Sequence, residues 1–564
     1  MDIDQHNPTV DNGADAVSSE EQCDSLPIES MEIATAPEKE EGGPSIESKQ
    51  DTPLAEHKDD TAVNGNKNGI DAEEKAEFVT PASIQKKVAP NEGKTSSPRG
   101  RKPKKRKASS MISTNDTLNG SSVLETSKAS TGGRKRFLKY EISAYAPNTP
   151  GVRILSCGEG EQIGHPGRTV TRKPRAVDTF PEGTTFVQVA AGGVHSVVLT
   201  SDGKVYSCGV NEKGTVPVIG LELEETTDNF TEIAFGPKIA KEGKVVQITA
   251  GASFSAALTQ KGSVIAWGNL RDQSGEVTAH KTLADIQKEP VVVITHKSKV
   301  IVKIAAGENH LAMLSNEGEL LTFGDGSMGQ LGRSMRTEHI RATYMADSSG
   351  KHLTVILLEG GRKLRVTDVF AGGYWTMAKL EDGRLFACGL DNFGQLGTNP
   401  TVEKDTENEE INRVPKLTHA TAFPSDKNWT HIAGIQHIVC RDQDGEIYAI
   451  GKNTDNALGI GTWVDNNDLD HWCYRTLQHV SLPEGMRAAG VTASLGSNIV
   501  WTDEGKVFAF GYDSVGQLGL GLKDDDEKIV PTPQEVRSLH LDDYRVIDAS
   551  ISANHTLFLA DQKK

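Results

Sequence analysis

Histidines that could do acid–base or binding chemistry recur at one fixed place of a repeated pattern in this chain of 564 residues. His195, His310 and His437 each follow a glycine by three residues, and His555 takes the same place in the last copy. Two interpretations stay open for such histidines. They hydrogen-bond between neighbouring repeats, or they converge on one face of the molecule and contact a partner there.

Three of the six cysteines also share one place in the repeat, namely Cys157, Cys208 and Cys388. The chain has no CxxC pair, no HExxH motif and no Gly-Lys-Ser/Thr phosphate loop, so metal ligation and phosphoryl chemistry are not indicated. We interpret these cysteines as buried thiols of a core in a reducing, intracellular compartment. We expect no metal, no cofactor and no enzyme activity.

The repeat itself is an Ala-Gly step, an apolar run, a short turn with glycine, a second apolar run and a closing glycine. The leading and closing glycines always lie 17 residues apart, whereas the segments between units vary in length. The pairs of positions are 192/209, 251/268, 307/324, 372/389 and 434/451, and Ser494 with Gly511 keeps the same spacing.

Each unit reads as β-structure. Short β-branched runs such as 197–199 and 204–206 flank Asp202-Gly203, and Asp-Gly between two such runs predicts a hairpin. Closing glycines recur every 51 to 65 residues, a period longer than that of a leucine-rich repeat or a WD-type blade. The fold class that we predict is all-β.

The two ends of the repeat region complete each other. The last copy, 552–559, stops before its closing strand, and a matching strand stands at 151–158. One unit is therefore assembled from both termini, which removes the edges that an open array would leave exposed. The sequence predicts a seven-bladed β-propeller closed by pairing N- and C-terminal strands in one blade, and preceded by a disordered N-terminal tail.

Composition separates the tail from the ring. Residues 1–140 hold three of the 30 aromatic residues, too few to bury the apolar surface that offsets ordering entropy. Residues 1–97 carry 22 acids and 8 bases, whereas residues 98–140 carry 12 bases and 2 acids. We expect an acidic disordered tail at 1–97, a basic tail at 98–140 and the propeller at 141–564.

The sequence also argues against a membrane-spanning protein and against a secreted one. No apolar run is long enough to span a membrane, so no membrane partner is expected. The N-terminus is acidic and polar, unlike a secretory signal.

Turns that read Gly-Gln-Leu-Gly follow three closing glycines, at 329–332, 394–397 and 516–519. With the Ala-Gly-x-x-His step, the seven-fold count and the split blade, the region 150–562 resembles the regulator of chromosome condensation family. The resemblance implies a chromatin-bound guanine-nucleotide exchange factor that promotes GDP release and GTP loading on the Ran GTPase in the nucleus. It also implies support of nucleocytoplasmic transport and of mitotic spindle and nuclear envelope assembly.

The resemblance further implies a GTPase-binding face and a protruding wedge. The positions that match the face are Glu161, His195, Asn309, His310, His437 and His555. The positions that match the wedge are Leu270, Arg271, Asp272, Gln273, Ser274, Gly275, Glu276 and Val277. Ala252 and Asn309 stand where the family has acids, and Phe254 replaces a histidine, so a non-exchanging chromatin-binding propeller scaffold stays open as the alternative.

A basic run in the tail has two interpretations. A dense Lys/Arg run is typical of a nuclear import signal, whose partner is an import receptor. Arg-Gly-Arg beside proline also resembles an AT-hook, whose arginines enter the narrow minor groove of DNA. The residues of the DNA and import tail are Arg99, Arg101, Lys102, Lys104, Lys105, Arg106, Lys107, Arg134, Lys135 and Arg136.

A second basic segment, Arg362, Lys363 and Arg365, follows Gly360-Gly361 between the fourth and fifth copies. Its place matches the loop by which the family binds the acidic patch of nucleosome histones, and the guanidinium fork suits carboxylate clusters. A solvated loop tip is the alternative interpretation.

Overall fold

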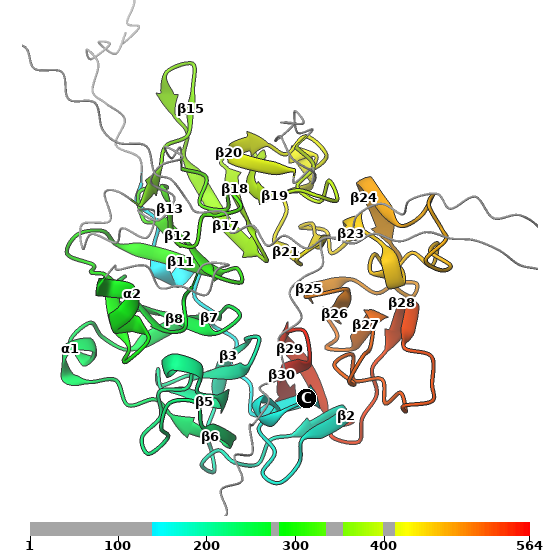
Figure 1. The fold of residues 1–564 in the computed structure, drawn as a ribbon, viewed down its shortest axis with the longest axis horizontal. Coiled ribbons are helices and arrows are strands. Elements are labelled where there is room, and N and C mark those ends of the chain that lie inside the picture. Colours follow the sequence, from blue (N-terminus) through cyan, green and yellow to red (C-terminus); the bar gives the residue numbers. More distant parts are fainter. Residues whose placement is uncertain (1–137, 272–280, 334–352, 399–411) are drawn as a thin grey trace, which may run out of the picture. The chain divides into compact units, whose positions relative to one another are not determined.

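The computed structural model describes residues 138–271, 281–333, 353–398 and 412–564. In these residues the chain forms seven four-stranded antiparallel sheets arranged in a ring around a central channel (Figure 1). The predicted all-β fold and the seven-bladed propeller are therefore confirmed. The predicted tails, apart from residues 138–140, lie outside the described residues.

In six of the seven blades, the order of the strands from the channel outwards is their order in the chain. The first blade is β3 (Phe186–Ala191), β4 (His195–Thr200), β5 (Val205–Val210) and β6 (Thr226–Glu232), and the second is β7 (Val245–Ala250), β8 (Phe254–Thr259), β9 (Val264–Gly268) and β10 (Val291–Ile294). The third is β11 (Ile301–Ala306), β12 (His310–Ser315), β13 (Leu320–Gly324) and β14 (Thr354–Val355).

The next three blades follow the same order. They are β17 (Val366–Gly372), β18 (Trp375–Leu380), β19 (Leu385–Leu390) and β20 (Arg413–His419); β21 (His431–Ala433), β22 (His437–Arg441), β23 (Ile447–Lys452) and β24 (Cys473–Val480); and β25 (Ala488–Ala493), β26 (Ser497–Thr502), β27 (Val507–Tyr512) and β28 (Ile529–Glu535). A two-stranded hairpin, β15 (Leu358–Glu359) and β16 (Arg362–Lys363), lies between β14 and β17.

The seventh blade joins the two ends of the ring. Its order is β29 (Tyr544–Ile551), β30 (His555–Gln562), β1 (Arg153–Glu159) and β2 (Val170–Ala176). Strand β1 pairs with β30 in continuous antiparallel register, from Arg153 opposite Ala560 to Gly158 opposite His555. This confirms the predicted closure.

The 17-residue spacing has a structural cause. In every blade the closing glycine lies opposite the first residue of the second strand, as Gly209 lies opposite His195 and Gly389 opposite Trp375. Gly389 has a φ of 122°, and a Cβ atom there would overlap the carbonyl oxygen of Tyr374. The close strand contact therefore requires glycine at this place.

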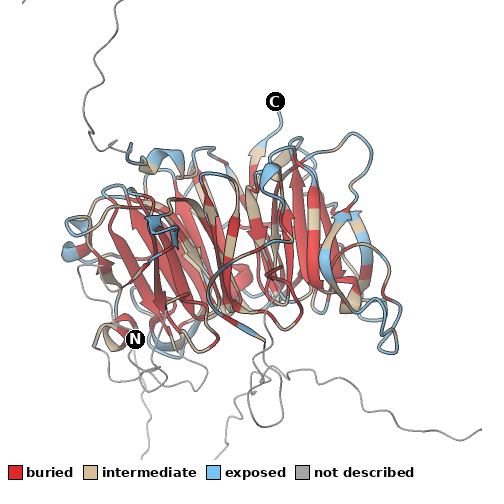
Figure 2. Cartoon of the chain, turned by 90° about the horizontal axis from the view of Figure 1, so that it is seen from above, coloured by how far each residue is buried: buried red, intermediate tan, exposed pale blue. Residues whose placement is uncertain are grey.

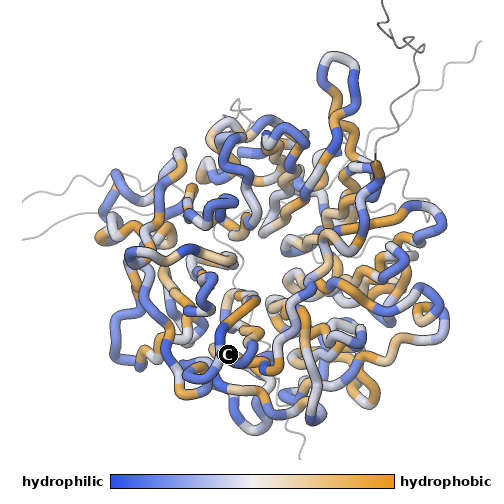
Figure 3. The backbone as a smooth tube through the Cα atoms, turned by 180° about the vertical axis from the view of Figure 1, so that it is seen from behind, coloured by the Kyte–Doolittle hydropathy of each residue, from blue (hydrophilic) through white to orange (hydrophobic). Residues whose placement is uncertain are grey.

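The apolar core lies between adjacent blades. Strands cross the thickness of the ring as buried segments, and the exposed residues gather at its two ends (Figure 2). Figure 3 shows the same pattern as apolar stretches within the blades and polar loops outside them. Cys157, Cys208 and Cys388 are fully buried as predicted, and burial raises the pKa of the Cys388 thiol to about 12.

The innermost strands form edges along the channel, and side chains of the preceding blade satisfy them. The backbone N–H of Ala191 donates to Ser550 Oγ at 2.9 Å, and that of Ile248 donates to Gln188 Oε1 at 2.9 Å. The N–H of Ala306 donates to Thr249 Oγ1 at 3.0 Å. These bonds remove unpaired donors that would weaken an exposed edge.

Alternating strand directions give the ring two distinct ends. Loops that leave the first and third strands of each blade share one end, which we call the glycine rim because it carries Gly192, Gly251, Gly307, Gly372, Gly434, Ser494 and Ser552. Loops that leave the second and fourth strands share the other end. We call it the hairpin rim, since it carries the β15–β16 hairpin, and the C-terminus lies there (upper edge of Figure 2).

Two short helices, α1 (Pro237–Ala240) and α2 (Lys281–Ile286), pack on the outside of the second blade. Over the described ranges, no helix has the length and apolar character needed to cross a membrane.

Candidate functional site

The four recurrent histidines lie just inside the glycine rim, and each bonds to the next blade. The Nε2 atom of His195 lies 2.6 Å from Ser255 Oγ, and that of His310 lies 2.9 Å from Thr376 Oγ1. His437 Nε2 lies 2.7 Å from Asn498 Oδ1, and His555 Nε2 lies 2.8 Å from Ser196 Oγ. These contacts match the interpretation that the histidines connect neighbouring repeats.

Burial also fixes the charge of these rings. All four are at most 1% exposed, and burial lowers the pKa of His195 and His555 to about 3 and that of His310 and His437 to about 4. They are therefore neutral at pH 7. A ring with no exposed surface does not offer a contact to a docked protein, so any effect of these histidines on a partner passes through the rim loops that they hold.

The glycine before each ring explains the motif. A Cβ atom on Gly307 would overlap Cε1 of His310 and lie 2.6 Å from its Nδ1. Phe254 packs in the same way on Gly251, and Trp375 on Gly372. The first four blades therefore share a flat ring on a glycine, and the imidazole is only one such ring.

Glu161 and Asn309 belong to loops of the glycine rim, Glu161 with a partly exposed side chain and Asn309 with a buried one. Glu161 begins a 3-10 turn (Glu161–Ile163) after β1 and is partly exposed. Asn309 is 9% exposed, and its side-chain oxygen has no hydrogen-bond partner within the part of the chain that the structure describes. Of the six residues expected on the face, Glu161 is the one with a partly exposed side chain, whereas Asn309 and the four histidines are buried.

The structure describes two residues of the predicted wedge, and one of them belongs to the core. Leu270 is fully buried and packs in a cluster with Phe254 and Leu283, so its place in a protruding wedge was wrong. Arg271 stays at the surface, 27% exposed, and pairs with Glu212 at 2.9 Å. The other positions, Asp272, Gln273, Ser274, Gly275, Glu276 and Val277, lie outside the described residues.

A polar network that the sequence interpretation missed holds the base of this segment. Asn269 donates to Glu212 Oε1 at 2.7 Å and accepts from Gln287 Nε2 at 2.8 Å. Glu212 follows the closing glycine of the preceding blade by three residues. An acid in a turn gives no sequence signal for a contact with the next blade.

The basic segment of the hairpin rim divides into one open residue and two paired ones. Arg362 is exposed in β16, and no ion pair involves it within the ranges that the structure describes. Lys363 pairs with Glu319. Arg365 pairs with Glu381 at 2.9 Å and leaves only 15% of its side chain exposed.

Arg365 also holds the chain that leads into the ring. Its guanidinium donates to the Leu138 carbonyl and lies 4.0 Å from the centre of the Tyr140 ring. Nearby, Tyr145 donates to the Thr367 carbonyl at 2.9 Å, and Lys139 pairs with Glu317 at 3.1 Å. Arg365 therefore clamps residues 138–145, and its predicted place in an open nucleosome-binding loop was wrong.

The DNA and import residues Arg99, Arg101, Lys102, Lys104, Lys105, Arg106, Lys107, Arg134, Lys135 and Arg136 lie outside the described residues. Across the described ranges, no group of three His, Cys, Asp or Glu side chains is arranged to hold a metal ion.

The comparison with protein families decides the classification. The model of the RCC1-like domain matches residues 153–558. The chain belongs to the RCC1-like family. The human protein named "Regulator of chromosome condensation" is 31% identical over 440 residues, which cover 76% of this chain and 94% of that protein.

Other RCC1-like relatives carry different names. The Saccharomyces cerevisiae "Guanine nucleotide exchange factor SRM1" is 25% identical over 67% of this chain and 79% of its own length. The Arabidopsis thaliana "Ultraviolet-B receptor UVR8" is 26% identical over 65% of this chain and 74% of its own length. The RCC1-like ring therefore occurs in proteins of different activity.

Solved structures share the RCC1-like fold. Yeast RCC1 (Prp20) bound to Kap60 aligns with a TM-score of 0.63 at 23% identity, over 78% of this chain and 97% of that one. Prp20p of Saccharomyces cerevisiae, in a study of its binding to Gsp1p and histones, aligns with a TM-score of 0.62 at 23% identity, over 76% of this chain and 96% of that one.

Proposed function

We propose that this chain is a guanine-nucleotide exchange factor for the Ran GTPase that works while bound to chromatin in the nucleus. The observation that carries the proposal is the similarity to the human regulator of chromosome condensation, which extends over 94% of that protein. A relative named as an exchange factor supports the same activity.

Exchange of this kind needs binding and no covalent step. A factor that binds the nucleotide-free GTPase tightly must weaken nucleotide binding by the same ratio, because the coupling between two ligands is reciprocal. We assign the GTPase to the glycine rim, where Glu161 and Arg271 are partly exposed. On this proposal the chain is not an enzyme, and it needs no cofactor.

We assign chromatin to the hairpin rim and the basic tail. Arg362 is the open guanidinium of that rim and suits the acidic patch of nucleosome histones, while Arg99, Arg101 and the lysines after them suit DNA phosphates. The binding of Prp20p to histones, and of yeast RCC1 to Kap60, supports histones and an import receptor as partners.

Nucleotide release tests the proposal. Purified Ran is loaded with a fluorescent GDP analogue, and release is followed after adding the full chain and excess GTP. We expect release to accelerate by at least about tenfold, since one ligand typically changes the affinity of a second ligand of the same protein by about 5- to 150-fold. An unchanged rate would rule out the exchange activity.

A non-exchanging chromatin-binding scaffold is the second candidate. Ala252 has no group to accept a hydrogen bond or pair with a cation, and Asn309 carries no charge. The ultraviolet-B receptor among the relatives shows that this ring also serves another function. Nucleosome binding without acceleration of GDP release would identify the scaffold.

A further inference from the structure

Among the equivalent positions of the seven glycine-rim loops at the mouth of the central channel, Glu308 supplies the ionisable side chain. The cavity behind it is also lined by His431 and by Asp548, whose carboxyl group lies 3.4 Å from the backbone nitrogen of Val189.

Seven loops line this mouth, one from each blade, and backbone hydrogen bonds join the loops of the first four blades. The N–H of Gly193 donates to the Ala252 carbonyl at 2.8 Å, that of Ala252 to Glu308 at 2.9 Å, and that of Glu308 to Gly373 at 2.9 Å. These bonds hold the Glu308 loop on both sides.

Equivalent positions of the seven loops differ sharply in chemistry. They are Gly193, Ala252, Glu308, Gly373, Ile435, Leu495 and Ala553. Glu308 is half-buried and lines the channel cavity, and its carboxyl group has no hydrogen bond or ion pair among the residues that the structure describes. Burial raises the pKa of this carboxyl group, which shows how little solvent or protein stabilises its charge.

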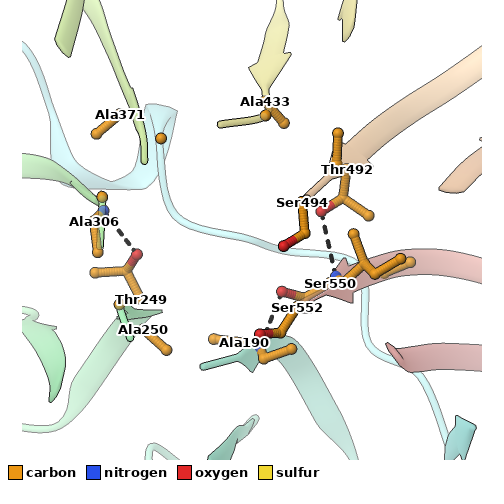
Figure 4. Close-up of a pocket in the computed structure, with 18 of the residues that line it drawn as sticks. Ala190, Thr249, Ala250, Ala306, Ala371, Ala433, Thr492, Ser494, Ser550 and Ser552 are labelled. Carbon is orange, nitrogen blue, oxygen red and sulfur yellow. Dashed lines mark hydrogen bonds between the residues drawn. The ribbon is translucent and has the colours of Figure 1, made fainter. Parts of the chain in front are cut away.

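Two hydroxyl groups across the mouth also lack partners. Ser494 and Ser552 take the place of the leading glycine in the sixth and seventh blades. They are 6% and 8% exposed, both point into the channel, and neither hydroxyl is hydrogen-bonded to any described residue (Figure 4). Both hydroxyl groups face the open channel, where they are available to a side chain that enters it.

The remaining wall selects for a cation with an apolar stem. Alanines of five blades line it, namely Ala190, Ala250, Ala306, Ala371 and Ala433 (Figure 4). Among the described residues of the lining none is lysine or arginine, and burial lowers the pKa of His431 to about 4, so this ring is neutral. The cavity volume of about 310 Å³ admits one side chain.

We propose that this mouth is a receptor site for a lysine side chain of a protein docked on the glycine rim. The carboxylate of Glu308 pairs with the ammonium group, the alanine wall packs on the aliphatic stem, and the hydroxyls of Ser494 and Ser552 donate to carbonyl oxygens of the same segment. The identity of the docked protein as the GTPase rests on the proposed function. The lysine site itself does not.

The first experiment uses N-acetyl-lysine methylamide as the probe and the full chain as the receptor, with binding followed by NMR titration. We expect Glu308→Gln to weaken binding by about tenfold or more, because hydrogen bonds to charged groups contribute about 1.5–3 kcal/mol, and tenfold equals 1.4 kcal/mol. Glu504→Gln is the matched control, since Glu504 is an exposed acid of the hairpin rim. Equal binding by the norleucine analogue, or by Glu308→Gln, overturns the proposal.

The second experiment asks whether the GTPase supplies the lysine. Single lysines of Ran are changed to methionine, and each is combined with Glu308→Gln in a double-mutant cycle of affinity for nucleotide-free Ran. Changing one lysine should lower the affinity of Ran for the wild-type chain by about tenfold and should change its affinity for Glu308→Gln little. If Ran binds and no lysine is coupled to Glu308, the site does not serve this partner and the proposal fails. If Ran does not bind at all, the proposed function fails, and the probe titration alone decides the lysine site.

Discussion

At the scale of residues, the packing of a flat ring on a glycine explains more of the repeat than the chemistry of histidine does. His195, Phe254 and Trp375 begin the second strand of the first, second and fourth blades, and each contacts the glycine three residues earlier. His195 hydrogen-bonds to the next blade through Nε2, and Trp375 does so through Nε1, which donates to the Gly434 carbonyl at 3.1 Å. Phe254 has no ring nitrogen, so ring packing on the glycine is what these three residues share.

A substitution at the glycine tests this packing. Gly307→Ala should lower the free energy of unfolding by about 1–3 kcal/mol, because the added Cβ must displace the ring of His310 in a packed core. Gly236→Ala is the matched control, since nothing lies within 4 Å of its Cβ position, and it should change stability by less than about 0.5 kcal/mol. Urea unfolding measures both, and equal effects would contradict the packing argument.

The buried histidines also predict a pH dependence. In the folded chain burial holds the pKa of His310 at about 4, whereas the unfolded value is about 6.5. Below pH 6.5 the unfolded state therefore binds a proton that the folded state does not. Stability falls as the pH falls from about 6.5 to 4, by about 1.4 kcal/mol per pH unit for each such ring.

His310→Phe isolates one ring, because phenylalanine already occupies this place as Phe254 in the second blade. Between pH 6.5 and 5 the free energy of unfolding of the variant should fall less steeply with pH than that of the wild type. The difference in slope should be about that of one bound proton, or about 1.4 kcal/mol per pH unit. Urea unfolding at several pH values gives the slopes. Comparing slopes removes the constant loss of the Thr376 hydrogen bond, and identical slopes would refute the neutral, buried ring.

At the scale of elements, the sequence predicts the strands well and the contacts of residues that flank the strands poorly. The 17-residue spacing follows from the pairing of neighbouring strands, in which Gly209 lies opposite His195. Such a hairpin joins residues that are close in the sequence, so the local sequence pattern predicts it. Leu270 and Arg365 were misplaced for another reason. Leu270 is buried by Leu283 of α2, and Arg365 by Tyr140, which lies 225 positions earlier in the chain.

The split blade is the element on which closure of the ring depends. Deleting residues 151–158 removes β1, leaving β30 unpaired on one side and β2 without a partner. The melting temperature of the whole ring should fall by more than about 10 °C, since several kcal/mol of pairing and packing are lost. A chain that lacks only residues 563–564 is the control. An unchanged melting curve would show that the ring does not need this closure.

The clamp around Tyr140 makes a separate prediction. Arg365→Ala should speed proteolytic cleavage within residues 138–150 several-fold and leave the melting of the ring nearly unchanged, because its contacts hold that segment and not a blade core. Arg362→Ala is the matched control in the same hairpin and should not change cleavage. Equal cleavage of the two variants would show that Arg365 does not hold this segment in place.

At the scale of the whole molecule, antiparallel strands separate the two proposed interfaces by the thickness of the ring. Arg362 lies on the hairpin rim, whereas Glu161 and Asn309 lie on the glycine rim. A partner on one rim does not cover the other. Residues 138–145, which overlap the end of the basic block at 98–140, contact the hairpin rim through Asn316 and Arg365.

This separation predicts that the two activities can be removed independently. Arg362→Glu should weaken nucleosome binding by about tenfold, the loss expected for a charge-assisted contact, and leave Ran nucleotide release in solution unchanged. Glu161→Lys should slow release and leave nucleosome affinity unchanged. Release kinetics and nucleosome gel shifts measure both activities of both variants. A nucleosome-bound chain should still accelerate nucleotide release from Ran to the same rate as the unbound chain. Competition between nucleosome and Ran for one chain would contradict the assignment of the two partners to opposite rims, because sites separated by a rigid ring have no shared residue through which to exclude each other.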